Sequence, residues 1–215
     1  MIFQARPLIL GVFLTLATLL VSPLHAEPLR LVVFGDSLSA GYGLPPGEDF
    51  VTKLYEKVTT TNQDIVIANA GVSGDTSTGG LARLDWSIPN GTDGVILELG
   101  ANDMLRGIDP AVTAKAIDAM VSRLIERQIA VLMVGMQAAP NLGPAYVTQF
   151  NAIYPETAER YGVPLYPFFL DGVAANRALN QADGIHPNEA GVAVIVERIY
   201  PAVEAFIVSL RQSAS

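Results

Sequence analysis

The sequence predicts an α/β fold in which helices cover both faces of a central parallel sheet of about five strands. Short apolar runs rich in Val, Ile and Leu alternate with longer segments of helical periodicity from residue 29 onwards. The first of these runs is apolar apart from Arg30, which is typical of parallel strands buried on both faces. Polar, glycine-containing segments follow the runs, and α/β proteins place their ligands at the carboxyl ends of such strands.

Five segments are predicted as strands. The run 29–34 (Leu-Arg-Leu-Val-Val-Phe) stops abruptly at Gly35-Asp36-Ser37, which predicts a buried strand ending in a tight turn. The other predicted strands are 64–69, also expected to be buried, and 94–99, 129–136 and 163–166. The chain has no internal repeat, low-complexity tract or linker, so one domain is expected over 27–215.

The segments between the strands carry helical patterns. Residues 48–59 place Phe50, Leu54 and Val58 at the spacing of an amphipathic helix. Asp109-Pro110 supplies an N-cap followed by proline at the first helical position of a helix over 109–127. The remaining predicted helices are 76–84, 144–161 and 188–210.

The N-terminus has the pattern of a signal peptide. Arg6 precedes an apolar run over 8–21, and Ala26 supplies a small residue at the expected cleavage position. Residues 1–26 are therefore predicted to be removed, giving an exported protein, periplasmic or secreted, with no stable membrane insertion after cleavage. An uncleaved N-terminal anchor is the alternative, disfavoured because the apolar run is short for a bilayer span.

The composition excludes several classes of protein. The absence of cysteine rules out disulfides and thiolate metal sites, so the protein must be stabilised by its core alone. A mature chain of about 190 residues can bury roughly 70% of its unfolded surface, which is sufficient. The formal charge of −8 and the lack of a basic stripe argue against a nucleic-acid partner. The oligomeric state stays open, with a monomer as the default.

The loops after the predicted strands carry residues suited to acyl transfer. In a parallel sheet these loops gather at one end, which would bring together 35–37, 69–76 and 100–103. Ser37 is a candidate nucleophile, provided that a base accepts its proton. The alternative is that Asp36, Ser37 and Ser39 only cap the next helix.

The candidate base is His186. The chain has two histidines, and His25 lies in the predicted signal peptide. Asp183 stands three residues before His186, with Gly184 allowing a tight turn, so its carboxylate can orient the imidazole. The alternative is a turn with a surface histidine ahead of a helix that begins near Asn188.

Three groups are candidates for stabilising an oxyanion: the backbone N–H of Ser37, the backbone N–H of Gly74 and the side-chain amide of Asn102. Turn geometry is the alternative role of Gly74, and a helix cap or Asx turn that of Asn102. An apolar wall for the substrate is expected from residues after Asn102 and in the loop 136–143, with ordinary loop packing as the alternative. These candidate wall residues are Met104, Leu105, Ile108, Ala138 and Pro140.

Taken together, the motifs resemble the four ordered blocks of the SGNH (GDSL) hydrolase superfamily. Gly-Asp-Ser-Leu-Ser contains Ser37, Ser-Gly-Asp-Thr contains Gly74, Gly-x-Asn-Asp contains Asn102, and Asp-x-x-His joins Asp183 to His186. Four motifs in order are much more specific than any one of them. The chain is most similar to the exported bacterial thioesterase I/protease I/lysophospholipase group, also called arylesterases, over nearly the whole of 27–215.

This resemblance implies a flavodoxin-like three-layer α/β/α sandwich, with Ser37 as nucleophile, His186 as base, Asp183 as its partner, and Ser37, Gly74 and Asn102 as oxyanion donors. It implies no metal or organic cofactor. The expected activity is hydrolysis of small-molecule esters, namely aryl and short-to-medium acyl esters, extending to acyl thioesters and lysophospholipids. Two departures are Ala101, where relatives often have glycine, and the loop 136–143, which lacks the arginine expected for thioester preference.

Two other functions are consistent with the predicted fold. A carbohydrate O-acetyl esterase of the same superfamily would act on acetylated sugars alone. A non-catalytic binding module would be expected to lose members of the triad, and this chain has them all. Nucleotide binding is not expected, because no glycine-rich phosphate-binding motif follows a predicted strand.

Overall fold

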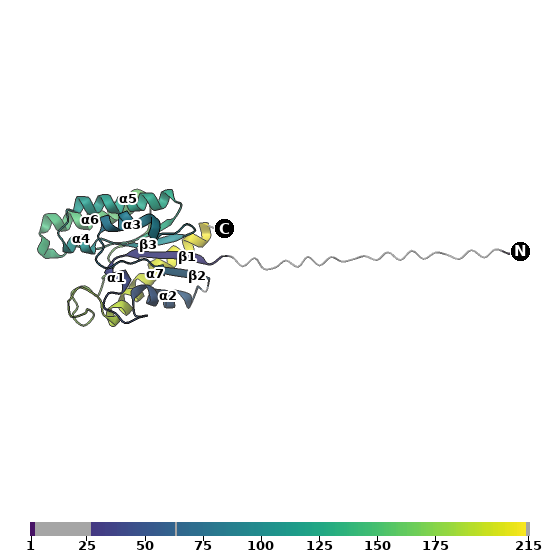
Figure 1. The fold of residues 1–215 in the computed structure, drawn as a ribbon, viewed down its shortest axis with the longest axis horizontal. Coiled ribbons are helices and arrows are strands. Elements are labelled where there is room, and N and C mark those ends of the chain that lie inside the picture. The colour runs from purple at the N-terminus through teal and green to yellow at the C-terminus, as the bar shows by residue number, and fades with distance from the viewer. Residues whose placement is uncertain (3–26, 63, 214–215) are drawn as a thin grey trace.

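A computed structural model describes residues 1–2, 27–62 and 64–213 (Figure 1). The predicted signal peptide lies almost wholly in 3–26, outside the described residues. The core of the fold is one parallel sheet with the strand order β2-β1-β3-β4-β5. Its strands are β1 (Leu29–Gly35), β2 (Ile65–Asn69), β3 (Gly94–Glu98), β4 (Ala130–Val134) and β5 (Leu165–Tyr166).

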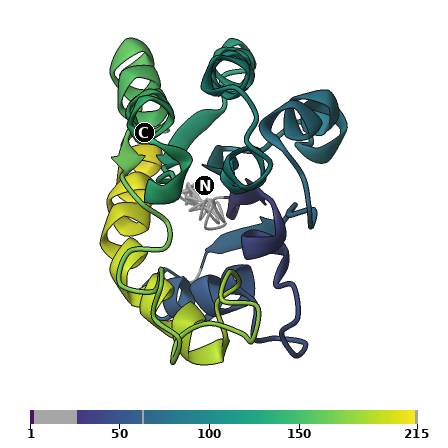
Figure 2. The same ribbon diagram turned by 90° about the vertical axis from the view of Figure 1, so that its left-hand side faces the viewer.

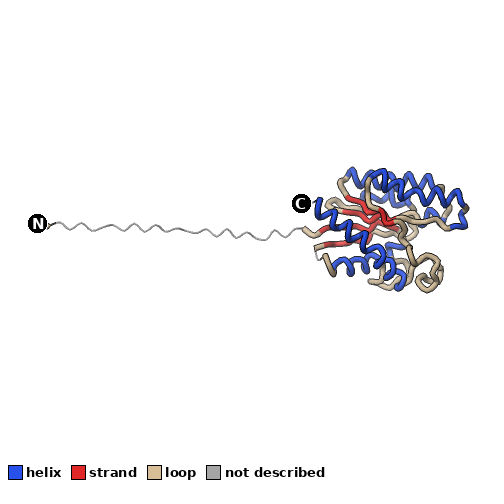
Figure 3. The backbone as a smooth tube through the Cα atoms, turned by 180° about the vertical axis from the view of Figure 1, so that it is seen from behind, coloured by secondary structure: helices blue, strands red, loops and turns tan. Residues whose placement is uncertain are grey.

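Helices cover both faces of this sheet. One layer contains α2 (Phe50–Thr59) and α7 (Glu189–Ser213), which pack against each other. The other contains α3 (Ser77–Ser87), α5 (Pro110–Glu126) and α6 (Pro144–Tyr161), with α5 between its two neighbours. The end view in Figure 2 and the view from behind in Figure 3 show the strands between these layers. The predicted three-layer α/β/α fold is confirmed.

Three short helical segments complete the described chain: α1 (Ser37–Ala40), α4 (Ala101–Leu105) and the 3₁₀ turn η1 (Pro140–Leu142). Each follows a strand, so each lies at the carboxyl end of the sheet, where sequence motifs place the candidate site. The predicted helix 76–84 is longer than expected and ends at Ser87, and the C-terminal helix extends to Ser213.

The core is centred on β1 and β3, which with β4 are the inner strands of the sheet. All five residues of β3 are buried, and so are the last five residues of β1. Phe50 of α2 meets Phe169 edge to face at 4.9 Å, which joins the helix layer to the segment after β5. A rigid, fully packed support therefore lies directly behind the turn that carries Ser37.

The prediction that 64–69 forms a buried strand is wrong. Ile65 is the only buried residue of β2, and Val66 is 49% exposed. The reason is strand order: β2 is an edge strand that pairs with β1 alone. Apolar composition does not distinguish an inner strand from an edge strand of the same sheet.

In the part of the chain that the structure describes, no helix is both long and apolar enough to span a lipid bilayer.

Candidate active site

The turn after β1 gives Asp36 and Ser37 different roles. Asp36 is the N-cap of α1, and its Oδ1 accepts a hydrogen bond from the Leu38 N–H at 3.0 Å. Ser37 is the first residue of α1, so its backbone N–H has no hydrogen-bond acceptor within the helix. A Cβ at Gly35 would lie 2.8 Å from the Glu98 backbone carbonyl oxygen, so only glycine fits against β3 at this position.

Ser37, His186 and Asp183 form a continuous hydrogen-bonded chain. His186 Nε2 lies 2.9 Å from Ser37 Oγ, and His186 Nδ1 lies 2.6 Å from Asp183 Oδ2. The loop curls back as the sequence predicts, because Gly184 adopts a positive φ of 72°. These three side chains have the geometry of a nucleophile, a base and an orienting carboxylate.

The second oxygen of Asp183 fixes the loop itself. Oδ1 accepts hydrogen bonds from the backbone N–H groups of Ile185 at 2.9 Å and His186 at 3.1 Å. Partial burial would raise the pKa of Asp183, but the hydrogen bonds from the His186 ring and from these two backbone groups lower it to about 2. Asp183 is therefore ionised throughout the neutral range and can stabilise a protonated imidazole.

Tyr42 packs against the imidazole, a contact that the sequence analysis did not anticipate. The rings of Tyr42 and His186 lie 4.7 Å apart between centroids, tilted by 39°. Gln181 Nε2 donates to the Tyr42 carbonyl at 2.8 Å, which fixes this backbone beside the His186 loop. The available sequence signal was the Ser-Ala-Gly-Tyr that follows the nucleophile motif.

Asn102 and Asp103, adjacent on α4, point in different directions. Asn102 Nδ2 donates to Asp36 Oδ2 at 3.0 Å, and a primary amide has a second N–H that this bond leaves free. Asp103 is fully buried and accepts from Ser77 N at 2.7 Å, Ser77 Oγ at 2.5 Å and Thr113 Oγ1 at 3.0 Å. Asp103 thus holds the first residue of α3, a helix whose N-cap is Thr76.

A buried carboxyl pair lies beneath the nucleophile turn. Burial raises the pKa of Asp36 to about 6, although hydrogen bonds from Leu38 N and Asn102 lower it. Burial and the Asp36 charge raise the pKa of Glu98 well above its ordinary value. Glu98 Oε2 accepts from Ser39 Oγ at 2.8 Å. Two close carboxylates in a dry site disfavour each other's ionisation, so Glu98 is harder to ionise while Asp36 is charged.

Gly74 lies in the exposed loop after β2, with φ of 82°. Its carbonyl accepts a hydrogen bond from Arg106 Nη2 at 2.7 Å, which ties this loop to the end of α4. Gly74 is not among the residues that line the pocket beside Ser37. Its role as an oxyanion donor stays a prediction.

Ser37 and His186 open into a pocket of about 450 Å³, within the usual size range of small-molecule sites. Four of the five predicted wall residues line it: Met104, Leu105, Ala138 and Pro140. Ile108 does not. Its carbonyl instead accepts a hydrogen bond from Tyr146 Oη at 2.9 Å, so the chain has already turned away from the pocket.

The opposite wall comes from the segment after β5, which the sequence analysis did not connect to the site. Phe168, Leu170, Ala174 and Ala175 line the pocket from this side. A larger groove of about 580 Å³ between α5 and α6 includes no triad residue. Among the described residues, no group of three or more His, Asp or Glu side chains is placed to hold a metal ion.

Comparison with known proteins agrees with this geometry. Residues 33–194 match the model of the GDSL-like lipase/acylhydrolase family. The chain belongs to this family. The family resemblance inferred from the four motifs is thereby confirmed.

Relatives within the family carry esterase names. The chain is 36% identical to Esterase TesA of Pseudomonas aeruginosa, over 85% of this chain and 92% of the relative. It is 40% identical to an arylesterase of Vibrio mimicus, over 74% of this chain and 80% of the relative. Among solved structures it resembles AlinE4, described as an SGNH-hydrolase family esterase, with a TM-score of 0.71 and 42% identity over 84% of this chain and 97% of that one.

Proposed function

We propose that this protein, an esterase of the GDSL family, hydrolyses carboxylic esters through an acyl-enzyme on Ser37. The observation that carries the proposal is the pair of contacts at His186, 2.9 Å to Ser37 Oγ and 2.6 Å to Asp183 Oδ2. A serine hydroxyl becomes an effective nucleophile when a neutral imidazole nitrogen is within hydrogen-bonding reach.

In the acylation step, Ser37 Oγ attacks the ester carbonyl while His186 Nε2 accepts the hydroxyl proton. Asp183 holds the proton on Nδ1, which leaves Nε2 free to act as the base. The protonated ring then gives its proton to the leaving alcohol. Tyr42 covers one side of the ring, and an aromatic face favours the cation that forms there.

The negative charge on the carbonyl oxygen is stabilised by the N–H of Ser37 and the amide of Asn102. Asp36 fixes that amide, because the Asn102 Nδ2 to Asp36 Oδ2 bond leaves one N–H aimed away from the carboxylate. The N–H of Gly74 is the third donor of the proposal. Deacylation repeats the sequence, with water in place of Ser37 and His186 again as the base.

The pocket favours esters whose acyl and leaving groups are uncharged. Among the described residues that line it, His186 is the only ionisable side chain, and most of the others are apolar. Aryl esters and short-to-medium acyl esters fit such walls better than the anionic leaving groups of acyl-CoA or lysophospholipid. A sugar ester would bring many hydroxyl groups to a wall with few hydrogen-bonding partners.

Export is the second part of the proposal. The charge, apolar run and small residues of 1–26 support removal of this segment after translocation to the periplasm or the medium. The mass of the protein purified from a bacterial periplasm tests it. A mature N-terminus near Glu27 is expected, whereas retention of 1–26 with the membrane fraction would contradict it.

The Ser37→Ala variant tests the mechanism. Loss of the nucleophile is expected to lower turnover of p-nitrophenyl esters on the order of a million-fold, with the fold unchanged by circular dichroism. Ser39→Ala is the matched control, since Ser39 contacts Glu98 and lies in the same motif. A serine-directed phosphonate should label the wild type at Ser37. Near wild-type turnover in Ser37→Ala would refute the mechanism.

A chain-length series tests the substrate class. We expect p-nitrophenyl acetate to hexanoate to be hydrolysed with higher kcat/KM than the matching acyl-CoA thioesters. Activity restricted to acetylated sugars would instead favour a carbohydrate O-acetyl esterase.

A further inference from the structure

Arg83 of α3 is a buried cation outside the triad. The residue is 6% exposed, and arginines are rarely buried to this degree unless their donors are all engaged. Its guanidinium carbon lies 4.0 Å from the centre of the Phe34 ring. Since the guanidinium stays charged at any accessible pH, a buried arginine is retained only where its partners compensate for the lost hydration.

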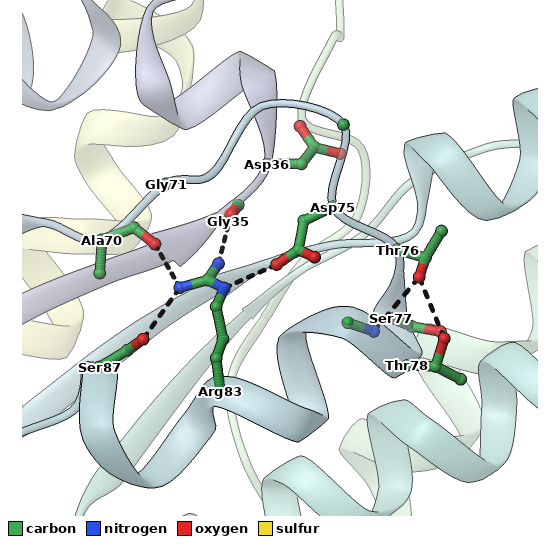
Figure 4. Close-up of polar contacts among 12 residues, drawn as sticks. Gly35, Asp36, Ala70, Gly71, Asp75, Thr76, Ser77, Thr78, Arg83 and Ser87 are labelled. Atoms are coloured by element: carbon green, nitrogen blue, oxygen red, sulfur yellow. Dashed lines mark hydrogen bonds and ion pairs between the residues drawn. The ribbon is translucent and has the colours of Figure 1, made fainter.

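The partners of Arg83 converge from three segments, as Figure 4 shows. Nε donates to Asp75 Oδ2 at 2.6 Å, and Nη2 donates to the Gly35 carbonyl at 2.9 Å. Nη1 donates to the Ala70 carbonyl at 2.8 Å and to Ser87 Oγ at 3.2 Å. Apart from Ser87, one turn further along α3, these acceptors lie in the turn before Ser37 and in the loop that carries Gly74.

Beyond Val72 the loop is held by a turn bond from Asp75 N to Val72 O at 3.1 Å, by Arg106 on the Gly74 carbonyl and by Arg83 on Asp75, and of these two arginines Arg83 also contacts the turn before Ser37. The first part of the loop continues the β1–β2 pairing, through Ala70 N to Val33 O at 2.8 Å and Val72 N to Gly35 O at 3.1 Å. At Gly71 it passes so close to α1 that a Cβ would lie 2.5 Å from Ala40 N. After Val72 the chain leaves the sheet, and Arg83 binds it again through the Asp75 carboxylate.

We propose that Arg83 is a positioning residue for catalysis, which fixes the Gly74 N–H relative to the Ser37 N–H. One guanidinium plane contacts Gly35, two residues before Ser37, and Asp75, one residue after Gly74. The two backbone donors of the proposed oxyanion hole are thus connected through a single rigid group. The inference rests on the proposed function and deepens it.

Only arginine has the required shape. Its planar fork presents donors in several fixed directions, whereas a lysine ammonium is one point charge on a flexible stem. Arg83→Lys can keep the ion pair with Asp75 but cannot also reach the Gly35 and Ala70 carbonyls in the same geometry. The substitution therefore retains the charge and removes the connection between the two donors.

The test compares Arg83→Lys with Arg127→Lys in the otherwise intact protein. Arg127, the C-cap of α5, also donates to a carbonyl, that of Ile88 at 2.6 Å, and it approaches Asp85 at 3.8 Å, but neither partner belongs to the turn before Ser37 or to the loop that carries Gly74. Both variants are expected to lower Tm. Only Arg83→Lys is expected to lower kcat, by roughly 10- to 100-fold with little change in KM, less than complete loss of an oxyanion donor would cost.

A transition-state analogue separates positioning from general loosening. A trifluoromethyl ketone forms a tetrahedral adduct with its oxygen in the oxyanion hole, so its affinity should fall by the same factor as kcat. Rates are expressed per active site titrated with the phosphonate, which removes unfolded protein from the comparison. Asp75→Ala, a second variant, should show the same pattern, and the double variant should cost less than the product of the single effects.

The inference is overturned if Arg83→Lys and Asp75→Ala lower Tm but leave kcat per titrated site and inhibitor affinity unchanged. It is also overturned if Arg127→Lys lowers kcat equally. Failure of the proposed function is a separate outcome, since it appears as activity in Ser37→Ala whatever the Arg83 variants do.

Discussion

Two substitutions of Asp183, by Asn and by Ala, should rank in one order for stability and in the opposite order for activity. The two carboxylate oxygens have separate partners: Oδ1 accepts from Ile185 N and His186 N, and Oδ2 accepts from His186 Nδ1. In Asp183→Asn, the amide oxygen will occupy the Oδ1 position, because two backbone donors point there. The amide NH₂ then faces Nδ1, and a donor at this place requires Nδ1 to carry no proton.

That exchange disables the base. With its proton moved to Nε2, His186 presents a donor to Ser37 Oγ at 2.9 Å instead of an acceptor. An aspartate-to-asparagine change that fixes the wrong tautomer costs about 10⁴-fold in turnover in a serine protease. The Asp183 side chain is 38% exposed, and water can compete for its partners, so we expect roughly 10³-fold here.

Asp183→Ala should be the more active of the two variants, because nothing then forces the ring into the wrong tautomer. It should also be the less stable, because the two backbone N–H groups lose their acceptor, at a cost of about 1 kcal/mol each. In Asp183→Asn the acid limb of the kcat/KM profile should move to lower pH, since the imidazolium loses its carboxylate.

Three measurements check this pair of variants: kcat/KM for p-nitrophenyl butyrate from pH 4 to 9, the urea midpoint of unfolding, and the imidazole ¹⁵N shifts. The ¹⁵N shifts report the tautomer directly. If Asp183→Asn is faster than Asp183→Ala at pH 8, or if its ring keeps the Nδ1 proton, the argument from the two oxygens is refuted.

The remaining predictions concern Asn102, a proposed oxyanion donor, and Asp36, which accepts a hydrogen bond from its amide. Asn102→Ala should lower kcat by roughly 10²- to 10³-fold with little change in KM, and a loss of stability with an unchanged rate per titrated site would make Asn102 structural. Asp36→Asn should lower kcat about 10-fold, because two amide NH₂ groups would face each other. Because burial raises the pKa of Asp36 from 3.8 to about 6, wild-type stability should fall by about 2 kcal/mol as pH rises from 4 to 7. In Asp36→Asn that fall should be smaller in urea titrations, and an unchanged pH dependence would contradict the reasoning.

The sequence was sufficient to predict that Ser37, Asp183 and His186 come together, because each is specified locally. Ser37 follows an apolar run directly, and Asp183 reaches His186 across a three-residue turn that Gly184 permits. Parallel strands then bring the two segments together at one end of the sheet, whatever the order of the strands. Composition added the last constraint, since the chain offers few histidines.

Strand order is what the sequence could not provide, and the errors follow from it. The edge position of β2 exposed a segment predicted to be buried. Ile108 was assigned to the pocket wall by its proximity to Asn102, whereas the wall comes partly from the segment after β5. The role of Arg83 can be inferred only once β1 and the loop after β2 are known to be adjacent. Its acceptors, the Ala70 and Gly35 carbonyls, lie 13 and 48 residues away in the sequence.

The same limitation changes how the acid limb of the rate profile should be interpreted. On sequence grounds, a mature chain with one histidine assigns the acid limb to protonation of His186 alone. The structure adds Asp36, whose pKa is raised by burial to about 6 and whose charged form accepts the Asn102 amide. Protonation of His186 removes the base, while protonation of Asp36 weakens the hold on an oxyanion donor. Both events reduce the rate as the pH falls, so the acid limb cannot be assigned to His186 alone, and Asp36→Asn removes the part due to Asp36.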